Sequence, residues 1–507
     1  MLPELIELIA VYIAQPYDLL RYLDAVENGL RLPFRSLRAL LSASLRSPGL
    51  RLWPALVLPL SSHDASLRQY ASDCIELFSI VRVRSLEAHG ITSLLRPATL
   101  LSLGPLTTPD EVRAVCMAPW RARLVALELH LWDRLLAHDV WTPTSLALLG
   151  ACVRSQPQLA SLRLRWQLDQ SHDAFQHVLS DVLDLGRSLS HLALSFNEAS
   201  KVVWNEALAT RLGSWLCTSR VTSLALDGLR FDSMHAATRL VASLHGAPLL
   251  RELRLDSLQL ERALSRAALP PALRSLCVHG ASLLPQWRTA AHLSTLALHF
   301  EFQYKTSGKS GPCCRIFDLQ HDADQEALVA LLPQLTELHL DTNSLGNAGA
   351  LRLIATLHEC RYLQVLSLIQ QGVTDVSAIA FATAERPSTL RTLRLGRNHV
   401  TCVGATALCH VIPHLDVLDL SRNRIRYDGA KAISNVLPLT THMRTLDVQM
   451  NPLSEAGVLV LVAALGRETA LRAGVLDLSA TVSRAYVPPC RAAIKSLPCP
   501  HYVVFRC

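Results

Sequence analysis

Two segments of the sequence combine residue types that catalysis could use. Residues 172–177 and 321–324 each place histidine beside aspartate, the side-chain pair of general acid–base chemistry. Neither segment lies in a known catalytic motif, because the sequence contains no G-x-S-x-G, H-E-x-x-H or G-x-G-x-x-G. We therefore interpret both segments as helix caps or solvated turns. The sequence predicts a chain that is not an enzyme and needs no cofactor.

A third segment has the residues of a phosphate-binding loop. Residues 308–310 read Gly-Lys-Ser, but that loop also requires a glycine five residues before Gly308, where the sequence has Gln303. We reject nucleotide binding on this ground. The surrounding stretch, 301–325, is predicted to be a flexible insertion loop, a place where binding or phosphorylation sites often lie.

A repeated pattern supplies the elements that must position the polar side chains. Residues 335–345 read L-x-x-L-x-L-x-x-N-x-L, and four further copies follow at 363–373, 390–400, 415–425 and 443–453, after steps of 28, 27, 25 and 28 residues. Leucines at positions 4 and 6 alternate with polar residues at 3, 5 and 7, which predicts a short strand. The asparagine at position 9 suits the turn that ends it. Helical patterns separate the strands at 349–357, 404–412 and 429–437.

These copies are similar to leucine-rich repeats of the ribonuclease-inhibitor-like class. The resemblance implies an α/β solenoid, a horseshoe with strands on its concave side and helices on its convex side. Looser copies begin at Leu124, so that about twelve repeats are countable, with a degenerate thirteenth at 476–478. We expect repeats over 124–489 and a C-terminal cap over 490–507, which would cover the last apolar face.

Composition sets limits on the class of protein. Hydrophobic residues make up 50% of the 507 residues, and the net charge is +7 without a run of five like charges, so no nucleic-acid-binding arm is expected. No apolar stretch reaches the length of a membrane span. The thirteen cysteines are scattered without C-x-x-C, and Cys152, Cys217, Cys360 and Cys409 are expected to act as small hydrophobes. The sequence predicts a soluble protein of the cytoplasm or nucleus that binds neither membrane nor nucleic acid.

The first fifty residues do not fit the repeat. Apolar residues at 2, 5, 6, 9 and 13 predict an amphipathic helix, Asp18 can cap a second helix, and a third is expected over 34–45. The segments 2–6 and 18–21, which read Leu-Pro-Glu-Leu-Ile and Asp-Leu-Leu-Arg, resemble an F-box, the adaptor-binding module of ubiquitin-ligase substrate receptors. By this resemblance the contacts with a Skp-type adaptor would be Leu2, Pro3, Leu5, Ile6, Ile9, Asp18, Leu19 and Leu20. The alternative is that these helices cap the solenoid.

Polar residues at positions 3, 5 and 7 share one strand face, so the candidate binding surface can be read from the sequence. Its charged members are Glu128, Arg163, Arg165, Asp227, Glu252, Arg254, Asp256, Glu337, Asp341, Arg394, Asp419 and Asp447, joined by His339. Eight acids against four arginines favour a protein substrate with a basic patch; alternatively the charges keep the face soluble. Histidines at 130, 191, 279, 299 and 339 also point inward, and the pair at 279 and 299 is a weak candidate for a metal or pH-sensing site.

We therefore expect a three-helix F-box-like head over 1–50 and an irregular linker, cap and degenerate repeats over 51–123, followed by the repeats and the C-terminal cap. F-box followed by leucine-rich repeats implies the substrate-recognition subunit of a Skp–cullin–F-box ubiquitin ligase. The head would bind the adaptor of the cullin complex, and the concave face would bind the substrate. The alternative is a leucine-rich-repeat interaction scaffold, similar to regulators of GTPases, without a link to ubiquitin.

Overall fold

The structure of the chain is a computed structural model. It describes residues 19, 22–23, 32–45, 55–58, 69–70, 73–74, 77–78, 80–83, 100–118, 120–132, 141–168, 172–184, 188–197, 200, 202–264, 266–278, 293–299, 322–440, 443–465, 475–479, 487–497 and 503–505. The chain forms two compact units, Met1–Leu273 and Arg274–Cys507. Each unit repeats one strand-and-helix pattern.

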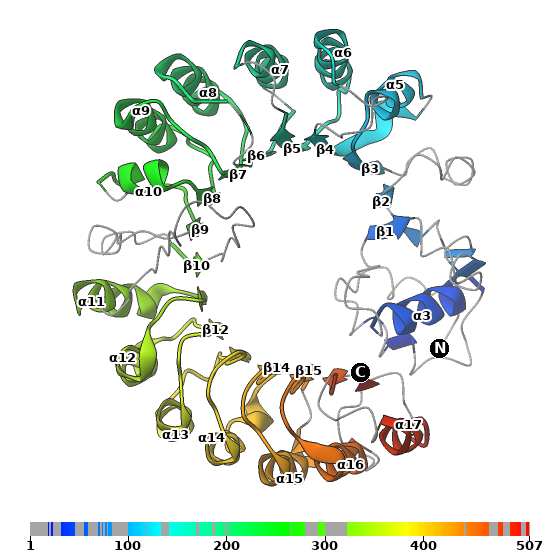
Figure 1. Ribbon diagram of the computed structural model, residues 1–507, viewed down its shortest axis with the longest axis vertical. Coiled ribbons are helices and arrows are strands. Elements are labelled where there is room, and N and C mark those ends of the chain that lie inside the picture. Colours follow the sequence, from blue (N-terminus) through cyan, green and yellow to red (C-terminus); the bar gives the residue numbers. More distant parts are fainter. Residues whose placement is uncertain are drawn as a thin grey trace, which may run out of the picture. The chain divides into compact units, whose positions relative to one another are not determined.

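In the first unit a parallel sheet runs from one repeat to the next in chain order. Its strands are β1 (Ala55–Leu58), β2 (Ile80–Val83), β3 (Leu100–Leu106), β4 (Leu124–Trp132), β5 (Ser161–Gln167), β6 (His191–Phe196), β7 (Ser223–Asp227) and β8 (Glu252–Asp256). Its helices are α3 (Leu32–Leu45), α5 (Pro109–Met117), α6 (Pro143–Arg154), α7 (His172–Asp184), α8 (Glu206–Thr218), α9 (Met234–His245) and α10 (Leu258–Leu264). The strands β3 to β8 lie along the inner edge of an arc, and the helices α5 to α10 lie along its outer edge (Figure 1).

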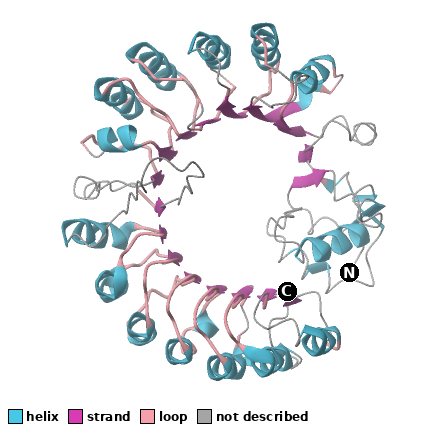
Figure 2. Cartoon of the chain, viewed as in Figure 1, coloured by secondary structure: helices cyan, strands magenta, loops and turns pink. Residues whose placement is uncertain are grey.

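The second unit has the same organisation, with the strands inside and the helices outside (Figure 2). Its strands are β9 (Ser275–Val278), β10 (Thr295–His299), β11 (Glu337–Asp341), β12 (Val365–Ser367), β13 (Thr392–Arg394), β14 (Val417–Asp419), β15 (Thr445–Asp447), β16 (Val475–Asp477) and β17 (Val503–Val504). Its helices are α11 (Asp322–Leu331), α12 (Gly346–Thr356), α13 (Asp375–Thr383), α14 (Cys402–Leu408), α15 (Tyr427–Val436), α16 (Ser454–Leu465) and α17 (Val487–Lys495). All neighbouring strands in this unit pair in parallel.

The leucines of the repeat form the core between the two layers. In β5 the side chains of Leu162 and Leu164 are buried, and the intervening Arg163 is exposed. Leu162 lies in register with Leu192 of β6, so equivalent leucines stack from repeat to repeat. Because a fully buried leucine contributes about 2 kcal/mol of transfer free energy, repeated stacking stabilises the solenoid without a single large core.

A buried amide at position 9, asparagine in four repeats and glutamine in one, bonds five repeats of the second unit to the repeat before each. The Nδ2 of Asn423 donates to the carbonyl oxygen of Leu395 at 2.9 Å, and its Oδ1 accepts from the N–H of Val400 at 3.0 Å. Buried amides at the equivalent positions do the same, and together they form the asparagine ladder: Asn343, Gln371, Asn398, Asn423 and Asn451. The predicted turn role of position 9 therefore extends to bonding between repeats.

The residue just before each ladder amide has a left-handed backbone. The φ angles are 62° at Thr342, 56° at Gln370 and Arg397, and 55° at Arg422 and Met450. This conformation is unfavourable for a residue with a Cβ atom, and hydrogen bonds from the adjoining repeat hold it in place. One of them joins the N–H of Arg422 to the carbonyl oxygen of Gln449 at 2.8 Å.

The structure confirms the predicted fold class, a leucine-rich-repeat solenoid with a parallel sheet and helices. Parallel pairing also runs upstream of Leu124, through β1, β2 and β3, in the region 51–123 that was predicted to hold an irregular linker, a cap and degenerate repeats. The last residues of the insertion loop predicted for 301–325 are helical instead. The helix α11 begins at Asp322, and Asp324 and Gln325 are buried. Residues 301–321 lie outside the described part of the chain.

Candidate functional site

The inner strand face is formed by the side chains that alternate with the buried leucines on each strand. All thirteen residues predicted for this face are described, and each lies exposed or half-buried on a strand. The predicted strand phase is therefore correct. The contacts between these side chains determine what the face can bind.

In the first unit the inner strand face carries a mixed aromatic and charged cluster, which we call the Trp132 patch: Glu128, His130, Trp132, Arg163 and Arg165. The indole of Trp132 is 38% exposed and packs edge-on against the ring of His130, with the ring centres 6.2 Å apart. Strand register places Glu128 opposite Arg163 and His130 opposite Arg165. The patch therefore combines an aromatic surface with two exposed guanidinium groups.

Ion contacts hold the acid of this patch between two bases. The Oε1 atom of Glu128 lies 2.9 Å from Nε2 of His130 and 3.7 Å from an Nη atom of Arg163. On β6 the residues opposite the arginines are Ala193 and Ser195, which have small side chains, and both arginines are exposed. This arrangement is suited to contact with another macromolecule.

The sequence analysis did not include Trp132 in the candidate site. The copies of the repeat predicted a strand of about five residues, whereas β4 spans nine residues and pairs with β5 as far as Gln167. The alternation of apolar and polar residues in the sequence could have predicted the position of Trp132. Residues 128, 130 and 132 lie on one face of β4, whereas 127, 129 and 131 are buried.

Further along the first unit the inner strand face carries the predicted charges of β7 and β8. The Nε of Arg254 lies 3.4 Å from a carboxylate oxygen of Asp227, and Asp256 lies opposite Asp227 in the register. Glu252 is exposed at the start of β8. These residues neutralise each other in part and leave a net negative charge at this end of the unit.

In the second unit the predicted residues of β11 bond to their neighbours. Nε2 of His339 lies 3.4 Å from Glu337, and the hydroxyl of Ser367 donates to Asp341 at 2.6 Å. His279 lies outside the described residues, as does the side chain of His299, so the predicted histidine pair is not described. Within the described ranges, no three His, Cys, Asp or Glu side chains are grouped in a way that could hold a metal ion.

Three aspartates at position 5 of successive repeats form a second cluster, the aspartate column: Asp419, Asp447 and Asp477. They lie opposite one another on β14, β15 and β16, where adjacent strands are about 5 Å apart. Each carboxylate accepts the backbone N–H two residues ahead, at 2.8, 3.0 and 2.9 Å respectively. Arg394 of β13 lies opposite Asp419 and ends the column on one side. Asp477, at the degenerate thirteenth repeat, extends the predicted acidic face.

The central carboxylate of this column resists ionisation. Burial and the negative charges of Asp419 and Asp477 raise the pKa of Asp447 to about 7, against the opposing effect of hydrogen bonds from the N–H and side-chain amide of Gln449. A cation placed on the column would favour the ionised form. The column therefore has the chemistry to bind a basic side chain.

Of the residues predicted to bind an adaptor, Leu19 is described and is fully buried. The remaining seven lie outside the described residues: Leu2, Pro3, Leu5, Ile6, Ile9, Asp18 and Leu20. The third predicted helix, 34–45, lies entirely within α3, which buries Phe34, Leu37, Leu40 and Leu41.

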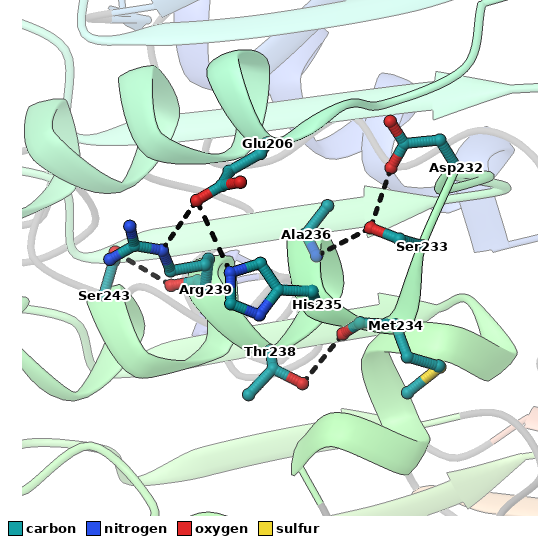
Figure 3. A network of polar contacts seen from close by, with 9 residues as sticks. All are labelled: Glu206, Asp232, Ser233, Met234, His235, Ala236, Thr238, Arg239 and Ser243. Carbon is teal, nitrogen blue, oxygen red and sulfur yellow. Dashed lines mark hydrogen bonds and ion pairs between the residues drawn. The ribbon is translucent and has the colours of Figure 1, made fainter.

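A further polar network lies on the helical side of the first unit (Figure 3). One carboxylate oxygen of Glu206 on α8 lies 3.1 Å from Nε of Arg239 and 3.5 Å from Nε2 of His235, both on α9. Ser233 caps α9 by accepting the N–H of Ala236 at 3.2 Å. These contacts join adjacent helices and leave no group poised for chemistry, so we interpret the network as structural.

The buried cysteines have thiols of low reactivity. Burial raises the pKa of Cys152 and that of Cys360 to about 12, so that both side chains remain thiols at neutral pH. Cys409 is half-buried, and burial raises its pKa to about 11. Cys217 differs from the prediction, because it is exposed at the end of α8 instead of packing in the core.

The repeats are similar to those of known proteins. A family model described as Leucine Rich repeat matches residues 386–409 and 411–434. The ribonuclease inhibitor of Sus scrofa is 32% identical over 149 residues, which cover 28% of this chain and 32% of that protein. The match thus spans about a third of the length of that relative.

Two solved structures are similar at low sequence identity. An internalin from Listeria monocytogenes has 15% identity and a TM-score of 0.37, with 77% of this chain and 92% of that chain covered. The structure of the yeast Rad7 and Elc1 complex has 15% identity and a TM-score of 0.36, with 66% of this chain and 83% of that chain covered. No helix in the described part of the chain is long and apolar enough to cross a membrane. The chain carries leucine-rich repeats with homology to ribonuclease inhibitor.

Proposed function

We propose that this chain is the substrate-recognition subunit of a Skp–cullin–F-box ubiquitin ligase. The inner strand face binds a protein substrate, and the N-terminal head binds the Skp-type adaptor. The chain catalyses no step itself. It acts by holding lysines of the substrate near the ubiquitin-charged enzyme, which raises their effective concentration.

The Trp132 patch is the observation that carries substrate binding. Tryptophan and arginine are the residue types most enriched among the side chains that dominate protein–protein affinity. Here a 38% exposed Trp132 lies on the same strand face as the exposed Arg163 and Arg165. Parallel strands hold the backbone of all three in register, so little backbone conformational entropy is lost on binding.

The aspartate column supports a substrate with basic side chains. Asp419, Asp447 and Asp477 lie on adjacent strands, and burial together with the charges of the two outer carboxylates raises the pKa of the central one. A lysine or arginine of the substrate would stabilise the ionised carboxylates. The same column would repel the phosphates of a nucleic acid.

The proposed link to ubiquitin is supported by the sequence of the N-terminal head. The Leu-Pro-Glu-Leu-Ile segment at 2–6 and the Asp-Leu-Leu-Arg segment at 18–21 resemble an F-box. The proposed adaptor contacts are Leu2, Pro3, Leu5, Ile6, Ile9, Asp18 and Leu20; Leu19 of the predicted set is fully buried and is not among them.

Co-purification from cells tests this function. Tagged full-length chain is expected to recover the Skp-type adaptor and the cullin, and Leu2→Asp/Ile6→Asp is expected to recover neither. Leu19 is left intact, because it is fully buried and a charge there would unfold the region. Trp132→Ala/Arg165→Ala is the matched control and should recover both partners. Failure of the wild type to recover the adaptor, or recovery by the head variant, would contradict the proposal.

A leucine-rich-repeat scaffold without a role in ubiquitination, similar to a GTPase regulator, is the second candidate. It is favoured by the matches to the family model and to the ribonuclease inhibitor, which report on the repeats. In this case the inner strand face would bind its partner as above, and the head would cap the solenoid.

A further inference from the structure

The loops that follow β13 and β14 carry a dense group of basic side chains, which we call the arginine edge: Arg397, His399, Arg422, Arg424 and Arg426. All five are exposed. Arg397 and Arg422 occupy position 8 of successive repeats, and His399 and Arg424 occupy position 10. The group therefore continues across two stacked loops.

Much of the net charge of the chain is concentrated here. Residues 386–434 contain eight arginines and lysines and three aspartates, a net charge of +5 compared with +7 for all 507 residues. Two of the three acids have other contacts, since Asp416 lies 3.7 Å from Arg444 and Asp419 belongs to the aspartate column. This leaves Asp428, in the first turn of α15, near the edge.

The side chains of the arginine edge are not neutralised by the described part of the chain. Exposed arginines elsewhere form ion pairs, such as Arg239 with Glu206 at 3.1 Å and Arg352 with Asp322 at 2.6 Å. No ion pair or side-chain hydrogen bond to a described residue is formed by Arg397, Arg422, Arg424 or Arg426. Their guanidinium groups are available to a partner.

Hydrogen bonds between adjacent repeats hold the backbone of these loops in place. Arg397 N–H donates to the carbonyl oxygen of Ser421, and Arg424 N–H donates to that of Val400, at 2.8 and 2.9 Å. Asn398 and Asn423 of the asparagine ladder also bond the same loops to the preceding repeats. A partner would therefore meet a loop surface that is already ordered, which reduces the entropic cost of binding.

Apolar side chains border the basic group. Met450 follows Arg422 at position 8 of the next repeat and is 41% exposed. On the other side, Arg426 N–H lies 3.3 Å from Sγ of Cys402, at the start of α14, where Val403 is 60% exposed. A ligand that covers the edge would thus contact both guanidinium and aliphatic groups.

We infer that the arginine edge is a second binding surface, which takes a short acidic segment of a partner protein containing both carboxylate and aliphatic side chains. Guanidinium groups bind carboxylates in a bidentate manner, and Met450 and Val403 provide the apolar contacts. A nucleic acid fits less well, because Arg394 lies opposite Asp419, so that the aspartate column begins beside the edge and repels a longer phosphate chain. This surface is independent of any role in ubiquitination.

Fluorescence anisotropy with a labelled peptide of glutamate, glycine and leucine tests the inference. The full chain should bind this peptide saturably, and Arg397→Gln/Arg422→Gln/Arg424→Gln should bind it about tenfold or more weakly. Glutamine is tolerated at position 8, since Gln370 occupies it with the same φ of 56°. The matched control, Arg211→Gln/Arg220→Gln/Arg251→Gln, removes the same charge from exposed positions of the first unit and should change the affinity by less than about twofold.

Two comparisons decide the class of partner. A peptide with lysine in place of glutamate should not bind, and a single-stranded oligonucleotide should bind more weakly than the acidic peptide. The inference is wrong if the wild type does not bind the acidic peptide, if both triple variants lose equal affinity, or if the oligonucleotide binds more tightly. Hydrogen exchange on the wild type provides a readout without substitutions, and protection by the peptide is expected in the loops at 395–401 and 420–427.

Discussion

Asp447 lies between two other carboxylates on adjacent strands, and this position explains the main electrostatic feature of the second unit. Burial, the charge of Asp419 and the charge of Asp477 all favour the protonated acid and raise its pKa to about 7. In the unfolded chain the same group would have a pKa near 3.8. Between about pH 4 and pH 7 the folded chain therefore holds a proton that the unfolded chain releases.

Stability should accordingly fall as the pH rises through this window. Asp447→Asn removes the charge but keeps an oxygen that can accept the N–H of Gln449, which now donates to the carboxylate at 3.0 Å. We expect the variant to be more stable than the wild type at pH 8 by about 1 to 3 kcal/mol, with little difference at pH 4. Urea unfolding of both proteins at the two pH values measures this. A variant that is less stable at pH 8 would contradict the assigned cause.

Cysteine reactivity provides a second test at the residue scale. Cys152 and Cys360 are buried thiols with pKa values raised to about 12, whereas Cys217 is exposed. Brief treatment of the native protein with iodoacetamide at pH 8, followed by mass spectrometry, should label Cys217 and leave the other two unmodified. Labelling of all three at equal rates would show that the core of the repeats is open.

At the scale of the element, the asparagine ladder connects successive repeats through polar bonds in addition to stacked leucines. Each ladder amide bonds within its own turn and also to the preceding repeat, as Asn423 does to Leu420 and Leu395. Loss of Asn423 leaves the buried N–H of Val400 without an acceptor and removes one donor from the carbonyl oxygens of Leu395 and Leu420. The cost should therefore exceed that of an ordinary surface hydrogen bond.

Asn423→Ala should lower the free energy of unfolding by about 1 to 3 kcal/mol, because the buried N–H of Val400 loses its acceptor and the carbonyl oxygen of Leu395 keeps only one of its two donors, Asn398. Chemical denaturation monitored by circular dichroism measures the change. Asn435→Ala, at an exposed position of α15, is the control and should stay within about 0.5 kcal/mol of the wild type. Equal effects of the two substitutions would rule out a special role for the ladder.

The regular repeats were predictable from sequence because each side chain has one local function. Leucines at positions 4 and 6 are buried wherever the pattern occurs, as Leu418 and Leu420 show. Features that depend on a neighbouring strand were not predictable in the same way. Trp132 joins the inner strand face because β4 continues along β5, and the pKa of Asp447 depends on residues 28 and 30 positions away in the sequence.

At the scale of the whole molecule, the repeats present surfaces of different chemistry. The first unit carries the Trp132 patch, and the second carries the aspartate column and, on its loops, the arginine edge. The net charge of +7 for the full chain does not show this separation, because the arginine edge is basic while the predicted inner strand face has eight acids and four arginines. Such separation suits a receptor that engages its partners through distinct surfaces.

The measurement that tests the central claim most directly is calorimetric titration of the full-length chain with purified Skp-type adaptor. The proposed role predicts saturable one-to-one binding, lost in Leu2→Asp/Ile6→Asp and kept in Trp132→Ala/Arg165→Ala. Absence of binding at adaptor concentrations of about 50 μM, which corresponds to a binding free energy weaker than about −6 kcal/mol, would contradict the role. The chain would then be an interaction scaffold whose head caps the repeats.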